Sequence, residues 1–274
     1  LRHVQPWTVV AARGHWYLLG FDTERWAQRA YRVDRITGPI SRVGEAGAYE
    51  LLMNGWARSS GLWSMNSANI QGLESERINV AGLGFTQKTE IAAAYTLWLQ
   101  GSGVGVAHAG IAQNFKETNV IALSIQALNL GSIERTTTQN PEGGIGTYKP
   151  TFLNIGVSYA KMFSNSISGG ITLRMINESL GNLNAFGFCV DAGLQYVTGP
   201  KNNIHFGVSL RNVGTPMKFK GDALSTSVQI VSSTTYQLTA ANTPNKFELP
   251  TQLNIGAAYD FWMGKKKEIQ PKVY

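Results

Sequence analysis

From residue 91 onward, apolar residues alternate with polar or small residues at a period of two. The alternation is clearest in five segments, at residues 154–159, 171–175, 188–196, 206–211 and 253–261. Successive side chains of a β-strand point to opposite faces, so each segment presents one apolar face and one polar face. Weaker alternation marks three more segments, at residues 91–98, 104–113 and 120–128. The pattern predicts an all-β fold with about eight antiparallel strands.

A two-layer sandwich would show the same alternation, but three features favour a sheet that faces lipid. Several segments have about nine to eleven residues, the length with which a tilted strand crosses a bilayer. Aromatic residues lie near the segment ends, where a membrane barrel has its interfacial girdle: Trp98, Tyr159, Phe163, Tyr196, Phe261 and Trp262. The polar faces carry charges that suit a hydrated interior, at Arg174, Asp191, Arg211 and Asp260. These features predict an antiparallel transmembrane β-barrel.

The connections between the segments also differ in length. Residues 164–166 and 199–203 form short turns, whereas residues 129–150 and 214–250 are long, polar and rich in Ser and Thr. Short turns on one rim and long loops on the other are typical of an outer-membrane barrel. The lengths of the connections therefore favour a membrane barrel as well.

The first 47 residues differ in composition from the rest, because they contain seven Arg and no Lys. Short strands are predicted at residues 4–11, 16–21 and 29–36. Three strands bury too little apolar surface to be stable alone. We therefore expect a partial domain at residues 1–47 and a second domain at residues 48–274. Since the chain begins with Leu1 and has no secretory signal there, we expect a processed, trimmed or fragmentary chain.

Composition and charge exclude several classes of protein. Hydrophobic residues make up 43% of the 274 residues and charged residues 15%, which excludes a disordered chain. The single cysteine, Cys189, excludes a disulfide scaffold, and the chain has no apolar run long enough for a membrane helix. The net charge of +7 comes from basic residues that are scattered except at residues 265–267. Nucleic-acid binding by the bulk of the chain is therefore not expected.

No motif in the chain predicts an enzyme. The four histidines, His3, His15, His108 and His205, lack the spacing of a zinc site, and Cys189 has no base beside it in sequence. Residues 143–146 form a glycine-rich stretch without the Lys-Ser/Thr of a phosphate-binding loop. Glu74 and Glu76 are two positions apart and are interpreted as solvated loop residues. We expect no catalytic residue, no metal and no cofactor.

The sequence after residue 47 contains several distinctive motifs. They are AYELLM at residues 48–53, SANIQGLES at 67–75, INVAGL at 78–83, PEGGIGTY at 141–148, DAGLQY at 191–196 and HFGVSLRNVG at 205–214. These motifs resemble the PorV and PorQ family, which are outer-membrane barrels of the type IX secretion system related in fold to the FadL fatty-acid transporter. In that family Asn69, Glu74, Asn79 and Gly82 fall in a plug-like segment, which implies a structural role in the lumen. Family barrels have about fourteen strands, so the resemblance implies an incomplete barrel that missing sequence or another chain completes.

The resemblance implies a function in protein transport in the outer membrane. Such barrels dock at the secretion pore, accept the C-terminal signal domain of a cargo protein and deliver it to the surface attachment machinery. The implied partners are outer-membrane lipid, the type IX translocon and attachment-complex proteins, and cargo signal domains. Contacts are expected at four loop residues, Glu134, Arg135, Thr147 and Tyr148. A FadL-like transporter of a hydrophobic small molecule is the alternative, which requires an apolar lumen.

The first 47 residues carry motifs of a different kind, HWYLLGFD at residues 15–22 and RAYRVDRI at residues 29–36. They resemble the WYL domain, a small Sm-like barrel of cytoplasmic transcription regulators that sense a ligand, often a nucleotide or nucleic acid. The resemblance implies a ligand site lined by Tyr17, Arg29, Arg32 and Arg35, because guanidinium groups suit phosphate or carboxylate. A WYL-type regulator in the cytoplasm is thus a further alternative. Because the two resemblances imply different compartments, we expect a chimera with its seam between residues 42 and 48.

Overall fold

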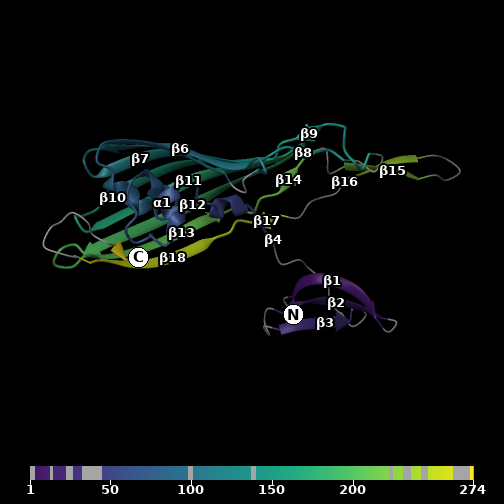
Figure 1. Ribbon diagram of the computed structural model, residues 1–274, viewed down its shortest axis with the longest axis horizontal. Coiled ribbons are helices and arrows are strands. Elements are labelled where there is room, and N and C mark those ends of the chain that lie inside the picture. The colour runs from purple at the N-terminus through teal and green to yellow at the C-terminus, as the bar shows by residue number, and fades with distance from the viewer. Residues whose placement is uncertain are drawn as a thin grey trace. The chain divides into compact units, whose positions relative to one another are not determined.

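Antiparallel β-strands make up most of the described chain, which confirms the predicted all-β class. The computed structural model divides into two units, Leu1–Glu45 and Ala46–Tyr274 (Figure 1). The division lies two residues before the one expected from composition. The structure describes residues 4–12, 15–22, 27–32, 45–97, 101–136, 140–221, 225–230, 236–241, 246–261 and 272–273.

The smaller unit contains a three-stranded antiparallel sheet in the order β1 (Val4–Ala12), β2 (His15–Asp22) and β3 (Ala27–Arg32). The first two strands lie where the alternation predicts them. The third begins two residues before its predicted start, and residues 33–36 of that prediction lie outside the described residues. The register of β1 shifts between Pro6 and Thr8. A residue without an N–H group is tolerated at such an irregularity.

Eight long strands of the larger unit form one antiparallel sheet. In sheet order they are β5 (Thr89–Leu97), β6 (Val104–Phe115), β7 (Asn119–Leu130), β10 (Thr151–Met162), β11 (Ile167–Leu180), β12 (Leu183–Thr198), β13 (Ile204–Gly214) and β18 (Gln252–Asp260). Each of the eight segments predicted from alternation overlaps one of these strands. The short strand β19 (Lys272–Val273) pairs with β18, and β14 (Phe219–Lys220) pairs with β12. Among the described residues β5 pairs only with β6, so no closed barrel is formed there.

The two long connections of the larger unit contain hairpins of their own. Strands β8 (Ile133–Glu134) and β9 (Thr147–Tyr148) pair in the first connection, and β15 (Ser225–Ile230) and β16 (Tyr236–Ala241) pair in the second. The remaining short strands are β4 (Glu45–Ala46) and β17 (Phe247–Glu248). The alternation does not predict these strands, because β4, β8, β9 and β17 have two residues each and the six-residue strands β15 and β16 lie in a long polar connection.

The two faces of the large sheet differ in the way that the alternation predicts. Along β11, Ile171 and Leu173 are 50% and 55% exposed, whereas Thr172 and Arg174 between and beside them are buried. The apolar outer face is therefore exposed in the described part of the chain, and the polar inner face is covered.

Residues 46–86, called the inner segment here, cover the inner face. They comprise η2 (Tyr49–Leu52), α1 (Ala57–Gly61), η3 (Leu73–Arg77) and η4 (Val80–Phe85), and η4 contacts β7, β10, β11 and β12. Apolar side chains of the segment pack on small residues of the strands, for example Leu83 on Ala112 and Ala160. Full burial of such a side chain contributes about 1.5–3 kcal/mol. The inner face is thus filled by protein here, in contrast to the hydrated interior that the sequence predicts.

Asn79 fixes the inner segment to the sheet. Its side chain Oδ1 accepts the N–H of Ala81 at the start of η4, and its Nδ2 donates to Leu194 O of β12 over 3.1 Å. Glycines of the inner face allow this close approach. A Cβ atom on Gly193 would lie 2.1 Å from Asn79 Oδ1, and one on Gly207 would lie 2.4 Å from Ser67 O. The small residues of the polar face are therefore explained by contact with the inner segment's backbone.

Candidate functional site

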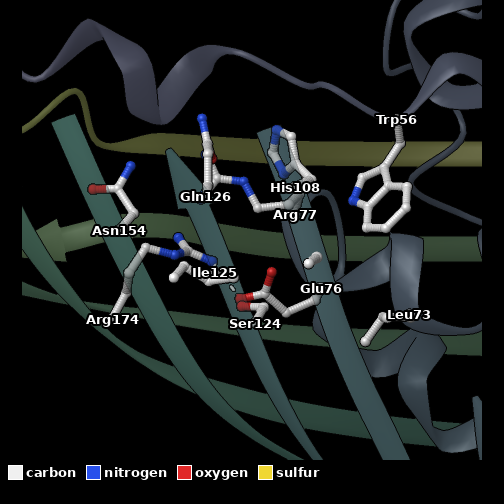
Figure 2. A pocket seen from close by; sticks show the side chains of 11 residues that line it. Trp56, Leu73, Glu76, Arg77, His108, Ser124, Ile125, Gln126, Asn154 and Arg174 are labelled. Atoms are coloured by element: carbon white, nitrogen blue, oxygen red, sulfur yellow. Dashed lines mark hydrogen bonds and ion pairs between the residues drawn. The ribbon is translucent and has the colours of Figure 1, made fainter. Parts of the chain in front are cut away.

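A buried group of charges lies where the inner segment meets β11 and β12 (Figure 2). The Arg174 guanidinium donates to Glu76 Oε1 over 2.7 Å and to Asp191 Oδ2 over 2.6 Å. All three side chains are almost fully buried. Although burial opposes it, the carboxylates of Glu76 and Asp191 raise the pKa of Arg174 above its ordinary value. Glu76, Arg174 and Asp191 therefore form a buried ion-pair network. Removing one member would leave a buried charge without its partner, which is destabilising.

A bulge in β12 and β13 brings Asp191 a second hydrogen-bonding partner. The register of the two strands shifts between Val190 and Ala192, and the backbone of Asn212 adopts a left-handed conformation with φ of 57°. The Asn212 N–H then donates to Asp191 Oδ1 over 2.6 Å. Both oxygens of the Asp191 carboxylate are therefore bonded, which offsets the cost of burying its charge.

Two further arginines are buried without an ion pair to any described residue. Arg77 donates to the carbonyls of Leu51 and Met53 over 3.2 and 3.5 Å. Arg211 donates to Leu51 O and Gln252 Oε1 over 3.4 and 3.5 Å. Burial lowers the pKa of Arg77 to about 9, with a smaller contribution from the charge of Arg174. Arg77 is still cationic at neutral pH, and besides the two carbonyl oxygens the charges of Glu76 and Asp191 favour its cationic form.

Two carboxyl groups of the larger unit, Glu50 and Glu178, are also buried. Burial raises the pKa of both Glu50 and Glu178 to about 7, and the charge of Glu50 contributes to the shift at Glu178. One oxygen of each carboxyl group, Oε1, has no hydrogen-bonding partner among the described residues. Both groups therefore exchange protons near neutral pH.

Neither His108 nor Cys189 is arranged as a catalytic group. His108 Nε2 accepts the N–H of Gly55 over 3.1 Å, and burial lowers the pKa of the imidazole to about 4. Burial likewise raises the pKa of the Cys189 thiol to about 11. At neutral pH the imidazole is therefore neutral and the thiol is protonated.

The cluster encloses one small cavity, which has room for about one water molecule. It is lined by Trp56, Leu73, Glu76, Arg77, His108, Ala109, Ser124, Ile125, Gln126, Asn154 and Arg174. A drug-sized ligand or a nucleotide needs a far larger pocket. In the part of the chain that the structure describes, no three His, Cys, Asp or Glu side chains are placed to hold a metal ion.

The structure brings together the four loop residues predicted from sequence. Glu134 lies opposite Thr147, and Tyr148 lies opposite Ile133, in the β8–β9 hairpin. The Arg135 N–H donates to Gly146 O over 2.8 Å and extends this pairing. Glu134, Arg135 and Thr147 are exposed.

The four residues predicted as a WYL-type ligand site are only partly described. Tyr17 lies opposite Arg32 in the register of β2 and β3, and Arg29 lies opposite Gly20. Arg29 and Arg32 are three positions apart in one strand, so their side chains point to opposite faces of it. Arg29 is exposed, and Arg35 lies outside the described residues.

The sequence gives little indication of the buried cluster. Glu76 is a buried ion-pair partner and not the solvated loop residue that its spacing to Glu74 predicts. Arg77, Glu50 and Glu178 are missed altogether. The one usable signal is a charged residue at an inner-face position of a strand, as at Arg174 and Asp191.

Comparison with known proteins finds a similarity at the N-terminal end of the chain. Residues 1–39 match the model of the WYL domain. The described part of this region is the β1–β2–β3 sheet with its arginine-bearing third strand.

Among curated proteins, the chain is similar to the protein PafB of mycobacteria. It is 46% identical to PafB of Mycobacterium tuberculosis and of Mycobacterium bovis over 48 residues, which is 18% of this chain and 14% of each relative. It is 24% identical to PafB of Mycobacterium leprae over 135 residues, 49% of this chain and 35% of that protein. The chain therefore spans well under half the length of the relatives that it matches.

These similarities correct the identification made from the motifs after residue 47. The PorV and PorQ assignment is wrong, since the family that matches is WYL and the curated relatives are PafB proteins. The outer-membrane location, the transport of secreted cargo, and the translocon, attachment-complex and lipid partners are wrong with it. The physical reason is that alternation shows which face of a sheet is apolar but not what covers that face.

The cytoplasmic location implied by the WYL-like part fits the comparisons better than the outer membrane does. A cytoplasmic protein, the alternative stated for that part, agrees with the similarity to PafB. In the ranges that the structure describes, helices are all too short or too polar to cross a membrane.

Proposed function

We propose that the chain carries part of a ligand-sensing WYL domain of a transcription regulator, which binds a phosphate-bearing ligand such as a nucleotide or nucleic acid. The observation that carries the proposal is the match of residues 1–39 to the WYL domain. The similarity to PafB over 48 residues supports it. On this proposal β1, β2 and β3 are strands of a small Sm-like barrel, of which the smaller unit is a part.

The arginines of this unit supply the chemistry that such a ligand requires. A guanidinium group donates two parallel hydrogen bonds to a phosphate and keeps its charge at any physiological pH. Arg29 is exposed on β3, where a ligand in solvent reaches it. The proposed contacts are Tyr17, Arg29, Arg32 and Arg35. Because Arg29 and Arg32 point to opposite faces of β3, a single phosphate group contacts only one of these two.

Binding of labelled single-stranded DNA and of a labelled nucleoside triphosphate by the full chain tests the proposal. We expect Arg29→Ala to weaken binding by roughly tenfold, because a hydrogen bond to a charged group contributes about 1.5–3 kcal/mol. A plot of the logarithm of the binding constant against the logarithm of salt concentration has a negative slope. The magnitude of this slope should fall by about one for each phosphate contact that is lost.

Arg58→Ala is the matched control, since Arg58 is an exposed arginine of α1 in the larger unit. It should leave binding unchanged. Equal losses in the two variants would show that binding depends only on net charge, and the proposal would then be wrong. Absence of binding to either probe would contradict it as well.

A further inference from the structure

Strand β5 lies at the edge of the large sheet and pairs only with β6 among the described residues. It pairs with β6 over all nine of its residues without a bulge, and it contains no Pro, Lys or Arg. Its single charged side chain is Glu90, whose Oε1 accepts the N–H of Leu73 over 2.9 Å within the same chain. Natural sheets protect a free edge with Pro, charged residues, a bulge or a short strand. Strand β5 has little such protection, so its edge is open to pairing with another strand.

The hydrogen-bond pattern shows which backbone groups of β5 face this open edge. The Asn114 N–H donates to Lys88 O over 2.7 Å, and these two residues lie opposite one another when the register of β5 and β6 is extended by one position. In an antiparallel ladder, residue pairs that exchange hydrogen bonds alternate with pairs that do not. The even-numbered residues of β5 therefore bond to β6. The N–H and C=O groups that point away from β6 belong to Thr89, Ile91, Ala93, Tyr95 and Leu97.

A second copy of β5 matches this edge when the two copies run antiparallel around a two-fold axis at Ala93. Ala93 then lies opposite Ala93 of the other copy, Ile91 lies opposite Tyr95, and Thr89 lies opposite Leu97. All nine residues overlap, and each residue with outward backbone groups meets another such residue. The outward N–H groups of both copies then donate across the axis, which gives about ten hydrogen bonds, the number of a typical protein interface.

The side chains fit the same register. Ile91 and Tyr95 both lie on the exposed outer face, and an aromatic residue opposite a β-branched residue stabilises a pair of strands. On the inner face Glu90 lies opposite Thr96, so no two like charges meet, whereas a shift that placed Glu90 opposite itself would bring two carboxylates together. One strand thus supplies both halves of a full-length match. Because two-fold dimers are the commonest assemblies, this match favours a second copy over an unrelated peptide.

We propose that the larger unit forms a symmetric dimer in which two β5 strands pair antiparallel about Ala93 and join the two large sheets into one. The dimer leaves the outer face of each sheet uncovered, since only the strand edges meet. An interface confined to a strand edge is smaller than that of a permanent dimer, so the association is reversible and depends on protein concentration.

Sedimentation equilibrium of the full chain tests the proposal. We expect the mass to rise from that of a monomer to that of a dimer between about 1 and 100 µM, the range in which a weak interface associates. Amide hydrogen exchange gives the location. The N–H groups of Ile91, Ala93 and Tyr95 should exchange more slowly in the dimer than in the monomer, because hydrogen bonds protect them only there.

A charge exchange at the two-fold axis is the decisive variant experiment. Ala93→Lys places two ammonium groups opposite one another, and Ala93→Glu places two carboxylates there; each should raise the dissociation constant at least roughly tenfold. Ala93 is exposed on the outer face, so both variants should fold. An equimolar mixture of the two should dimerise again, because unlike charges then meet. Ala192→Lys is the matched control, since Ala192 is exposed on the same face of β12, which pairs on both sides, and it should leave dimerisation unchanged.

Four results would overturn the proposal. The first is a full chain that stays monomeric over the whole concentration range. The second is a dimer that Ala93→Lys and Ala93→Glu both retain, which would place the interface elsewhere. The third is a mixture of these two variants that stays monomeric, which would exclude the register about Ala93. The fourth is a dimer that Ala192→Lys weakens as much as Ala93→Lys does, because association would then involve the apolar outer face and not the edge.

Discussion

Individual charged residues of the larger unit are buried to a degree that their sequence neighbours do not indicate. Glu76, Arg174 and Asp191 form one network, yet Arg174 is 98 positions from Glu76 and 17 from Asp191. Alternation predicts that Arg174 and Asp191 lie on the polar face of their strands, and this is confirmed. It does not predict Glu76 as the third member, because the inner segment has no period of its own. The alternation therefore predicts the members of the cluster that lie on strands, Arg174 and Asp191, and not Glu76.

The two buried carboxyl groups predict a pH dependence of stability. A folded-state pKa of about 7 at Glu50 and Glu178 lies above the ordinary value of 4.5. Such groups contribute stability below pH 4.5, and this contribution is lost as pH rises to about 7, since the unfolded chain releases the protons more readily. We expect the free energy of unfolding to fall by roughly 1–3 kcal/mol for each group over this range.

Glu50→Gln and Glu178→Gln keep the shape of the protonated side chain and do not titrate. Denaturant unfolding at pH 5 and pH 8 should therefore show a smaller pH dependence in each variant than in the original chain. Glu142→Gln, at an exposed residue, is the control and should leave the dependence unchanged. An identical dependence in all four proteins would show that other groups cause it.

At the scale of elements, the sequence predicts the long strands well but does not predict the inner segment that covers one face of their sheet. The eight long strands could be located because each is long enough to show several periods of alternation. The β8–β9 and β15–β16 hairpins could not, since these strands are short and lie within long polar connections. The inner segment is made of short helical turns, and its position depends on contacts with strands that are distant in sequence.

The glycines of the inner face give a direct test of this packing. We expect Gly193→Ala to lower the free energy of unfolding by roughly 1–3 kcal/mol, because its Cβ would lie 2.1 Å from Asn79 Oδ1. Gly61→Ala is the control, since a Cβ there meets no atom within 4 Å. It should leave stability unchanged or raise it slightly, because Ala favours a helix more than Gly does. Equal denaturation midpoints for both variants would contradict the described contact of the inner segment with β12.

At the scale of the whole molecule, the apolar outer face of the large sheet is its most unusual surface. Ile91 and Ile255, on the first and last long strands, are 76% and 75% exposed, and Leu194 of β12 is 56% exposed. Contiguous apolar surface of this kind favours contact with other apolar groups. The alternation of apolar and polar residues is sufficient to predict which side chains lie on this face. The alternation identifies no family, whereas the match to the WYL domain covers residues 1–39, where the motifs HWYLLGFD and RAYRVDRI resemble that domain.

This face predicts binding of a hydrophobic dye by the folded chain. We expect anilinonaphthalene sulfonate to gain fluorescence below the unfolding transition, because the exposed aliphatic side chains provide it an apolar surface. Leu173→Lys and Leu194→Lys together should reduce that signal. Asn165→Lys adds one positive charge away from the outer face and should not reduce it. A folded chain that leaves the dye in its aqueous state would contradict the described orientation of the outer face.

The central position of residues 46–86 also has a consequence for the order of assembly. Ser209 donates to Ile78 O across 131 positions, and Arg211 donates to Leu51 O across 160. During synthesis, residues 46–86 leave the ribosome before the strands that surround them in the folded unit. Their polar groups therefore have no hydrogen-bonding partners until those strands have been translated. Chains dominated by such distant contacts fold slowly, in milliseconds to seconds. We therefore expect folding of the larger unit to depend on chaperones that shield residues 46–86 until β18 has been translated.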